Sequence, residues 1–174
     1  MYNKITVATD GSSMGGKAVI VAAQLAKMCD ADLTIAHVLM HGEPPESLVR
    51  MAEVEHLVTD HPQIQTALDN IPGQMAAATA DTKHHRLDDA VIGVMGDAVV
   101  DRAKAAAVAT GATTVNTEVL TGDTADQIID AVNRHNSDLV VVGTRGLGPL
   151  KGLLMGSVSQ KISQLANCAC LVIK

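Results

Sequence analysis

Hydrophobic and polar positions follow two different periods along the chain, and these periods alternate. Helical spacing of apolar residues predicts a helix from about 12 to 29, a long helix over 87–109, and shorter helices beginning at 124 and 157. Strands that alternate with helices form β-α-β units, whose right-handed crossovers predict an α/β fold with a doubly wound, five-stranded parallel sheet and helices on both faces. The strands themselves are predicted from short apolar runs at 5–8, 33–39, 114–120, 138–142 and 169–173.

The ends of the predicted helices carry signals of their own. Thr124 with Gln127, and Ser157 with Gln160, have the spacing of capping boxes, so we expect Thr124 and Ser157 to be N-cap residues. Gly111 is placed to end the long helix. These boundaries fix where the loops at the sheet edge begin and end.

The segment from about 41 to 85 has the least regular pattern. The pair Pro44-Pro45 opens it, and Pro62 interrupts a weak amphipathic pattern. A length of 174 residues suits one domain. We therefore predict a single domain over 1–174 that carries a helical insertion at about 41–85.

Composition narrows the classes of partner. Hydrophobic residues make up 47% of the chain, yet there is no Phe or Trp, and Tyr2 is the only aromatic residue. The chain thus lacks the stacking platforms of single-stranded nucleic-acid binders. The formal net charge of -6 also disfavours a nucleic-acid partner. Charged residues interrupt every apolar stretch before the ~18 residues that a membrane span needs, so we expect no membrane insertion.

The cysteines indicate a compartment. Cys29, Cys168 and Cys170 form an odd, sparse set that is a poor disulfide framework. A reducing, cytoplasmic setting is the simpler interpretation. No carboxylate or cysteine at supporting spacing converges on His84-His85 or on the pair His56 and His61, so we predict no metal site.

Charge is unevenly distributed along the chain. The segment 143–174 has no Asp or Glu, whereas the chain as a whole is acidic. A basic segment on an acidic protein marks a local place for an anion, although surface lysines alone could give the same pattern. Its basic residues are Arg145, Lys151, Lys161 and Lys174.

A glycine-rich loop follows the fourth predicted strand. It runs GTRGLGPLKGLLMGS over 143–157 and leads into a helix. A loop after a buried parallel strand lies at the carboxyl edge of the sheet, and the following helix directs unpaired N–H groups toward it, as in phosphate sites. It is not a Walker A loop, because Lys151 is followed by Gly152, and it lacks the G-x-G-x-x-G spacing of dinucleotide sites.

The loop instead has the pattern G-x2-G-x9-G-S, at Gly143, Gly146, Gly156 and Ser157. With this pattern the chain resembles the ATP-binding branch of the universal stress protein family. The resemblance extends to KITVATDGS at 4–12, LTIAHV at 33–38, SDLVVVG at 137–143 and CACLVI at 168–173. It implies the adenine nucleotide alpha hydrolase-like fold of that family. Two features depart from the family pattern: the insertion is longer, and Ala169 stands where proline is common.

The resemblance also implies a ligand site for adenine nucleotide, specifically ATP with or without Mg²⁺. Asp10 would face the ribose, the backbone of Val38 would pair with adenine, and the loop would hold the phosphates. Such a site requires the first and fourth strands to be neighbours at a topological switch point. The binding residues implied are Ala8, Thr9, Asp10, Val38, Gly143, Thr144, Arg145, Gly146, Gly156, Ser157, Val158 and Ser159.

Three functions follow in order of preference. The first is an ATP-binding regulatory stress-response protein that signals through a partner protein of unknown identity, and that forms a homodimer through its last strand. The second is a slow ATPase or self-phosphorylating enzyme, for which Asp10 and Asp123 are the nearby acids. The third is a dimeric interaction protein that needs no nucleotide. Because the loop explains binding without chemistry, no catalytic residue is assigned.

Overall fold

Residues 1–39, 80–146 and 155–174 are described by a computed structural model. The chain divides into two compact units, one formed by Met1–Leu39 with Val99–Lys174 and the other by Met40–Ala98. Everything below concerns the first unit unless stated otherwise. Among the helices in the described ranges, none is both long and apolar enough to cross a membrane.

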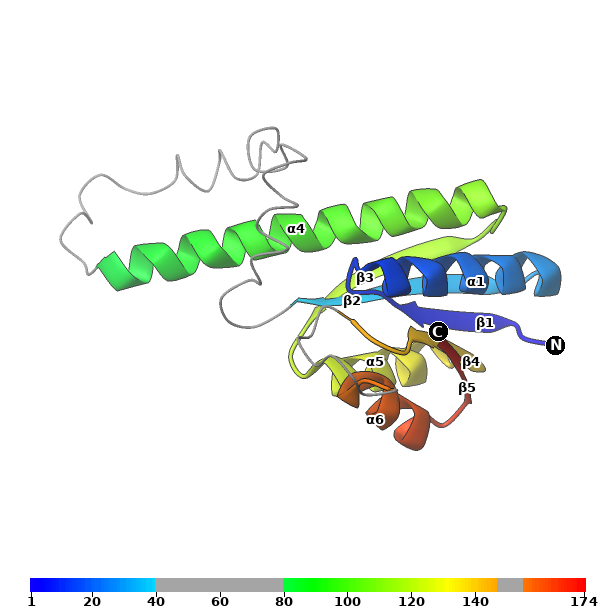
Figure 1. The fold of residues 1–174 in the computed structure, drawn as a ribbon. Coiled ribbons are helices and arrows are strands. Elements are labelled where there is room, and N and C mark those ends of the chain that lie inside the picture. The colour runs from blue at the N-terminus through cyan, green and yellow to red at the C-terminus, as the bar shows by residue number, and fades with distance from the viewer. Residues whose placement is uncertain (40–79, 147–154) are drawn as a thin grey trace. The chain divides into compact units, whose positions relative to one another are not determined.

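All five strands of the sheet are parallel (Figure 1). Their spatial order is β3-β2-β1-β4-β5, which places β1 at the centre and β3 and β5 at the edges. The predicted five-stranded, doubly wound sheet is therefore confirmed. The strands are β1 (Lys4–Ala8), β2 (Asp32–Leu39), β3 (Val115–Thr121), β4 (Leu139–Gly143) and β5 (Ala169–Ile173).

The helices cover both faces of this sheet, with α1 on one face and α5 and α6 on the other (Figure 1). The longest helix begins at residue 80, earlier than the predicted 87, so residues 80–85 are helical; the rest of the predicted insertion, up to residue 79, lies outside the described residues. The helices are α1 (Ser13–Cys29), α4 (Ala80–Thr110), α5 (Thr124–His135) and α6 (Ser157–Leu165).

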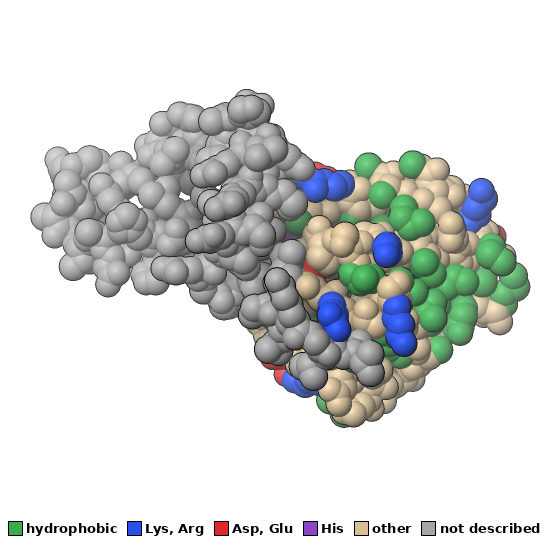
Figure 2. Space-filling model, in the orientation of Figure 1, with side chains coloured by type: hydrophobic (Ala, Val, Ile, Leu, Met, Phe, Trp, Pro, Cys, Tyr) green, Lys and Arg blue, Asp and Glu red, His purple; other side chains and the backbone are tan. Residues whose placement is uncertain are grey.

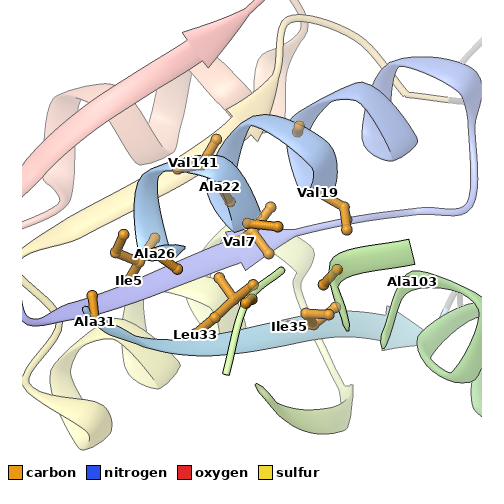
Figure 3. Close-up of a cluster of buried hydrophobic side chains, with 14 of the residues drawn as sticks. Ile5, Val7, Val19, Ala22, Ala26, Ala31, Leu33, Ile35, Ala103 and Val141 are labelled. Carbon is orange, nitrogen blue, oxygen red and sulfur yellow. The ribbon is translucent and has the colours of Figure 1, made fainter. Parts of the chain in front are cut away.

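Successive strand residues point to opposite faces of the sheet, so their side chains contribute to two separate hydrophobic cores. On one face, Ile5, Val7 and Leu33 pack against alanines of α1 and of the last part of α4 (Figure 3). On the other face, Val140 and Val142 pack against α5 and α6. Alanine on the helices lets them approach the sheet closely, so a dense core forms without Phe or Trp, and the half-buried Tyr2 packs against it.

The two predicted capping boxes are wrong. The N-cap of α5 is Asp123, whose carboxylate accepts a hydrogen bond from the N–H of Asp126, and the N-cap of α6 is Gly156. Thr124 and Ser157 are the first residues inside their helices. Aspartate caps a helix at least as well as threonine, and it stands one residue earlier. The predicted stop of α4 is confirmed, because Gly111 follows its last residue with φ +104°.

Candidate functional site

The centre of the sheet is a topological switch point. β1 lies beside β4, and the chain leaves β1 toward α1 on one face but leaves β4 toward α6 on the other. The segments that follow these two strands therefore separate at the carboxyl edge, where open α/β sheets bind ligands. The sequence analysis required the first and fourth strands to be neighbours, and β1 and β4 do lie side by side.

The turn after β1 is held by a chain of short-range hydrogen bonds. The N–H of Thr9 donates to the carbonyl of Ala36 over 3.0 Å, which extends the pairing with β2 beyond Ala8. One carboxylate oxygen of Asp10 accepts from the N–H of Ser12 at 3.0 Å, and the Ser12 hydroxyl in turn caps α1. Asp10 is thus placed at the beginning of α1, with its carboxylate oriented by the backbone.

Two glycines make room for this carboxylate. A Cβ added to Gly146 would overlap Oδ2 of Asp10, and one added to Gly15 would lie 2.9 Å from Oδ1. Gly146 belongs to the segment after β4, so the Asp10 carboxylate spans the switch point from one strand end to the other. The sequence pattern singled out Gly146 but missed Gly15, since a glycine inside a helix carries no motif of its own.

Thr144 ties together the two ends of the glycine-rich loop. Its N–H donates to the carbonyl of Ile173 at the end of β5 over 2.7 Å. Its carbonyl accepts from the N–H of Gly156 at 2.7 Å and from the hydroxyl of Ser159 at 3.0 Å. The chain therefore leaves β4 and enters α6 at the same place. The part of the loop between them, 147–154, lies outside the described residues.

The residues at the start of α6 have different surroundings. Ser157 and Val158 are exposed, whereas Ser159 is buried, and its hydroxyl also lies 2.9 Å from the carbonyl of Gly156. In a helix that begins at Ser157, the first N–H groups have no carbonyl within the helix to bond, and they carry the positive end of its dipole. This helix end is suited to an anion that approaches the loop.

The remaining predicted residues also lie near this edge. Ala8 pairs with Ala36, so Val38 is two positions further toward the carboxyl edge on the neighbouring strand. Arg145 and Gly146 are exposed beyond the end of β4. All twelve predicted site residues thus lie at the carboxyl ends of β1, β2 and β4 or at the N-cap and first turn of α6. This placement brings them together without assigning a contact to any ligand.

One buried residue beside this site was missed by the sequence analysis. His37 is only 8% exposed, and its Nδ1 lies 2.9 Å from the carbonyl oxygen of Thr9. Because a carbonyl can only accept, Nδ1 carries the proton. Burial lowers the pKa of His37, while the Thr9 carbonyl and the charge of Asp10 oppose this shift. The available signal was a histidine inside an otherwise buried strand pattern.

The basic residues of the last segment have different roles. Lys161 forms ion pairs with Asp126 at 2.7 Å and Asp123 at 3.2 Å, so it links α6 to α5. Lys174 directly follows Ile173, which pairs with Gly143 at the carboxyl edge. Figure 2 shows several Lys and Arg side chains spread over the viewed face of the described residues, separated by apolar and uncharged surface, and few acidic side chains. Lys151 lies outside the described residues.

The second candidate acid is already engaged. The carboxylate of Asp123 accepts hydrogen bonds from the N–H of Asp126 and from Lys161. The bond from the Asp126 N–H has the largest effect and the bond from Lys161 adds to it, and together they hold the pKa of Asp123 below its ordinary value. The Asp123 carboxylate is therefore a weaker base. Asp123 therefore fits a structural role at the start of α5 better than a catalytic one.

Other reactive groups form no further centre in the described ranges. Over those residues, no three His, Cys, Asp or Glu side chains group closely enough to hold a metal ion. Cys168 and Cys170 are free thiols that pack on the same face of the sheet, and burial raises the pKa of each. His56 and His61 lie outside the described residues.

Comparison with known proteins agrees with this architecture. The fold defines an α/β protein with a parallel sheet and a candidate ligand site at its switch point. The model of the universal stress protein family matches residues 1–174. Universal stress protein YxiE of Bacillus subtilis is 31% identical over 176 residues, covering 100% of both chains. The chain therefore belongs to the universal stress protein family.

Solved structures share the fold. A universal stress protein in complex with cAMP is 22% identical, with a TM-score of 0.61 over 99% of this chain and 97% of that one. A universal stress protein from Archaeoglobus fulgidus in complex with dAMP is 17% identical, with a TM-score of 0.58 over 99% and 98% of the two chains. At these identities the likeness establishes the fold alone.

Proposed function

We propose that this protein is a regulatory stress-response protein that binds ATP at the carboxyl edge of its sheet. The observation that carries the proposal is the approach of the Asp10 carboxylate to Gly146 across the switch point. A carboxylate there is placed to accept from ribose hydroxyls, and the glycine leaves the room that this carboxylate occupies at the end of β4. Membership of a family in which relatives are solved with cAMP and with dAMP supports an adenine nucleotide.

The start of α6 would hold the phosphates. The amides at 157–159, the dipole of the helix and the exposed cation of Arg145 all favour negative charge. The charge of a triphosphate suits this group better than that of a monophosphate, so we propose ATP rather than AMP. Mg²⁺ would be bound through the phosphates themselves, as is usual for this ion.

Thermal unfolding with added nucleotide tests the proposal. A ligand at a hundredfold excess over its dissociation constant stabilises the folded state by about 2.7 kcal/mol, which raises the melting temperature by about 5–11 °C for a chain of this size. Gly156→Val should abolish the rise, because a Cβ at Gly156 would already lie 3.3 Å from the Thr144 carbonyl. Gly16→Ala is the matched control, since nothing lies within 4 Å of the Cβ it adds.

The choice of ligand is tested in the same assay. ATP, ADP, AMP and cAMP are compared with and without Mg²⁺, and we expect the largest rise with ATP. Equal shifts for AMP and ATP would contradict the role of the α6 amides, and no shift with any nucleotide would contradict the binding site itself. Mass spectrometry of the denatured, freshly purified protein adds an independent check for nucleotide carried through purification.

Regulation through partners completes the proposal. We propose a homodimer through β5, which is an edge strand, and a protein partner that distinguishes the ATP-bound form. Three free cysteines are consistent with a reducing cytoplasm as the compartment. Hydrolysis is not part of the proposed function, because Asp10 is held by the Ser12 amide and Asp123 by Asp126 and Lys161.

A further inference from the structure

The imidazole of His37 holds the peptide group that leads into Asp10. Nδ1 of His37 donates to the carbonyl oxygen of Thr9 over 2.9 Å. On the other side of the same residue, the N–H of Thr9 donates to the carbonyl of Ala36. Both backbone groups of Thr9 are therefore bonded to β2, one through the main chain and one through a side chain.

A histidine is suited to this place for a chemical reason. The Thr9 carbonyl lies beyond the last β1 residue that pairs with β2 and needs a donor that reaches it from the side. An apolar side chain in the same buried position would leave that carbonyl without this bond, which costs free energy. Burial also lowers the pKa of His37, which favours the neutral ring, and a neutral ring has one donor nitrogen and one acceptor.

The orientation of the Thr9 carbonyl fixes the direction of the residue that follows. Because a peptide group is planar, a bond that holds this carbonyl also holds the amide of Asp10. The Asp10 carboxylate has little room to shift, since its two oxygens lie against Gly146 and Gly15. A small rotation of this peptide would therefore move the carboxylate out of the space that the two glycines leave.

We propose that His37 is a positioning residue for nucleotide binding, which acts by holding the Thr9 carbonyl so that the Asp10 carboxylate stays against Gly146. This inference rests on the proposed function. His37 need not touch the nucleotide; it acts through Asp10. A histidine that only fills the core would affect stability, but it would have no particular dependence on Asp10.

The test is a double-mutant cycle on ATP affinity, measured by titration calorimetry. In His37→Asn the side-chain amide nitrogen stands close to the place of Nδ1 and keeps the donor, whereas His37→Leu removes it. We expect His37→Leu to weaken ATP binding by about 5- to 30-fold and His37→Asn to remain within about 3-fold of wild type. In a protein that already carries Asp10→Asn, we expect His37→Leu to weaken ATP binding by less than about 3-fold.

The outcomes separate the inference from the function. If wild type binds ATP and His37→Leu weakens binding equally with and without the Asp10 carboxylate, the positioning role is wrong. Equal affinities for wild type and His37→Leu would also overturn it. If wild type itself fails to bind nucleotide, the proposed function falls, and the positioning role falls with it. Should His37→Leu not fold, His37→Gln replaces it, because its amide nitrogen stands near Nε2 and misses the Thr9 carbonyl.

Discussion

The carboxylate of Asp10 occupies the space in which any side chain at Gly146 would begin. The two residues come from segments that follow β1 and β4, which are distant in sequence but adjacent in the sheet. The carboxylate of Asp10 fits at this place because Gly146 has no side chain, and any larger residue at 146 would collide with that carboxylate.

Gly146→Ala is expected to weaken ATP binding by more than about tenfold and to destabilise the fold by about 1–3 kcal/mol, because its Cβ would overlap Oδ2 of Asp10. Affinity is measured by titration calorimetry and stability by urea unfolding. Gly16→Ala serves as the control, and it should stabilise the fold by up to about 1 kcal/mol, since an open helical position favours alanine. Equal affinities for Gly146→Ala and wild type would refute the role of the contact.

Removing the hydroxyl of Ser159 is expected to lower the free energy of unfolding by about 1–2 kcal/mol, because this buried group donates to the Thr144 carbonyl. The melting temperature should fall by about 2–8 °C. Ser157→Ala, at the exposed first residue of α6, should stay within about 0.5 kcal/mol. The opposite ranking, with Ser157→Ala the more damaging, would restore Ser157 as the N-cap.

Stability should decrease on mild acidification because of His37. Burial lowers the pKa of His37 below the ordinary value of about 6.5, so between the two values the unfolded chain binds more protons than the folded one. The free energy of unfolding therefore rises with pH through this window, by at most about 1.4 kcal/mol per pH unit, and levels off above about pH 6.5. Urea unfolding of wild type and His37→Asn at about pH 5 and pH 7.5 measures the effect. A pH dependence that His37→Asn leaves unchanged would assign it to other groups.

Val172→Pro is expected to convert the proposed homodimer to a monomer. The carbonyl of Ile173 accepts a bond from Thr144 on the β4 side, and neighbouring residues of a strand point their backbone groups in opposite directions, so the N–H of Val172 faces the open edge. Proline removes that donor. Light scattering after size exclusion measures the mass, with Val172→Thr as a control that keeps the N–H. A dimer that persists in Val172→Pro would place the interface elsewhere.

The sheet was predictable because each strand is a short apolar run, and the strand boundaries moved by at most one residue, whereas α4 begins seven residues before the predicted 87. Asp138 illustrates the shift: β4 begins one residue later, at Leu139, and the carboxylate of Asp138 accepts from the backbone N–H groups of Asn3 and Lys4 at the amino edge. The predicted cap of α5 failed because Asp123, one residue before Thr124, accepts the hydrogen bond from the first turn. Pattern matching alone does not weigh one capping residue against its neighbour.

The contacts of the site were less predictable than its place. Glycine spacing and strand order put the site at the carboxyl edge, but they said nothing of Gly15 or of the His37 bond to Thr9. Both depend on side chains that approach from different segments of the chain. Such approaches are set by how the layers pack, which a single sequence does not record.

The two hydrogen bonds that the Thr144 carbonyl accepts have a consequence for how the length of the loop can change. Gly156 and Ser159 bond to Thr144, so the end of β4 and the start of α6 are held next to each other. The distance between these two ends therefore does not depend on the number of residues that connect them. Doubling the length of a flexible loop costs only about 0.6 kcal/mol in closure entropy. Segments longer or shorter than 147–154 could therefore replace this part of the loop, and the bonds that join Thr144 to Gly156 and Ser159 would remain.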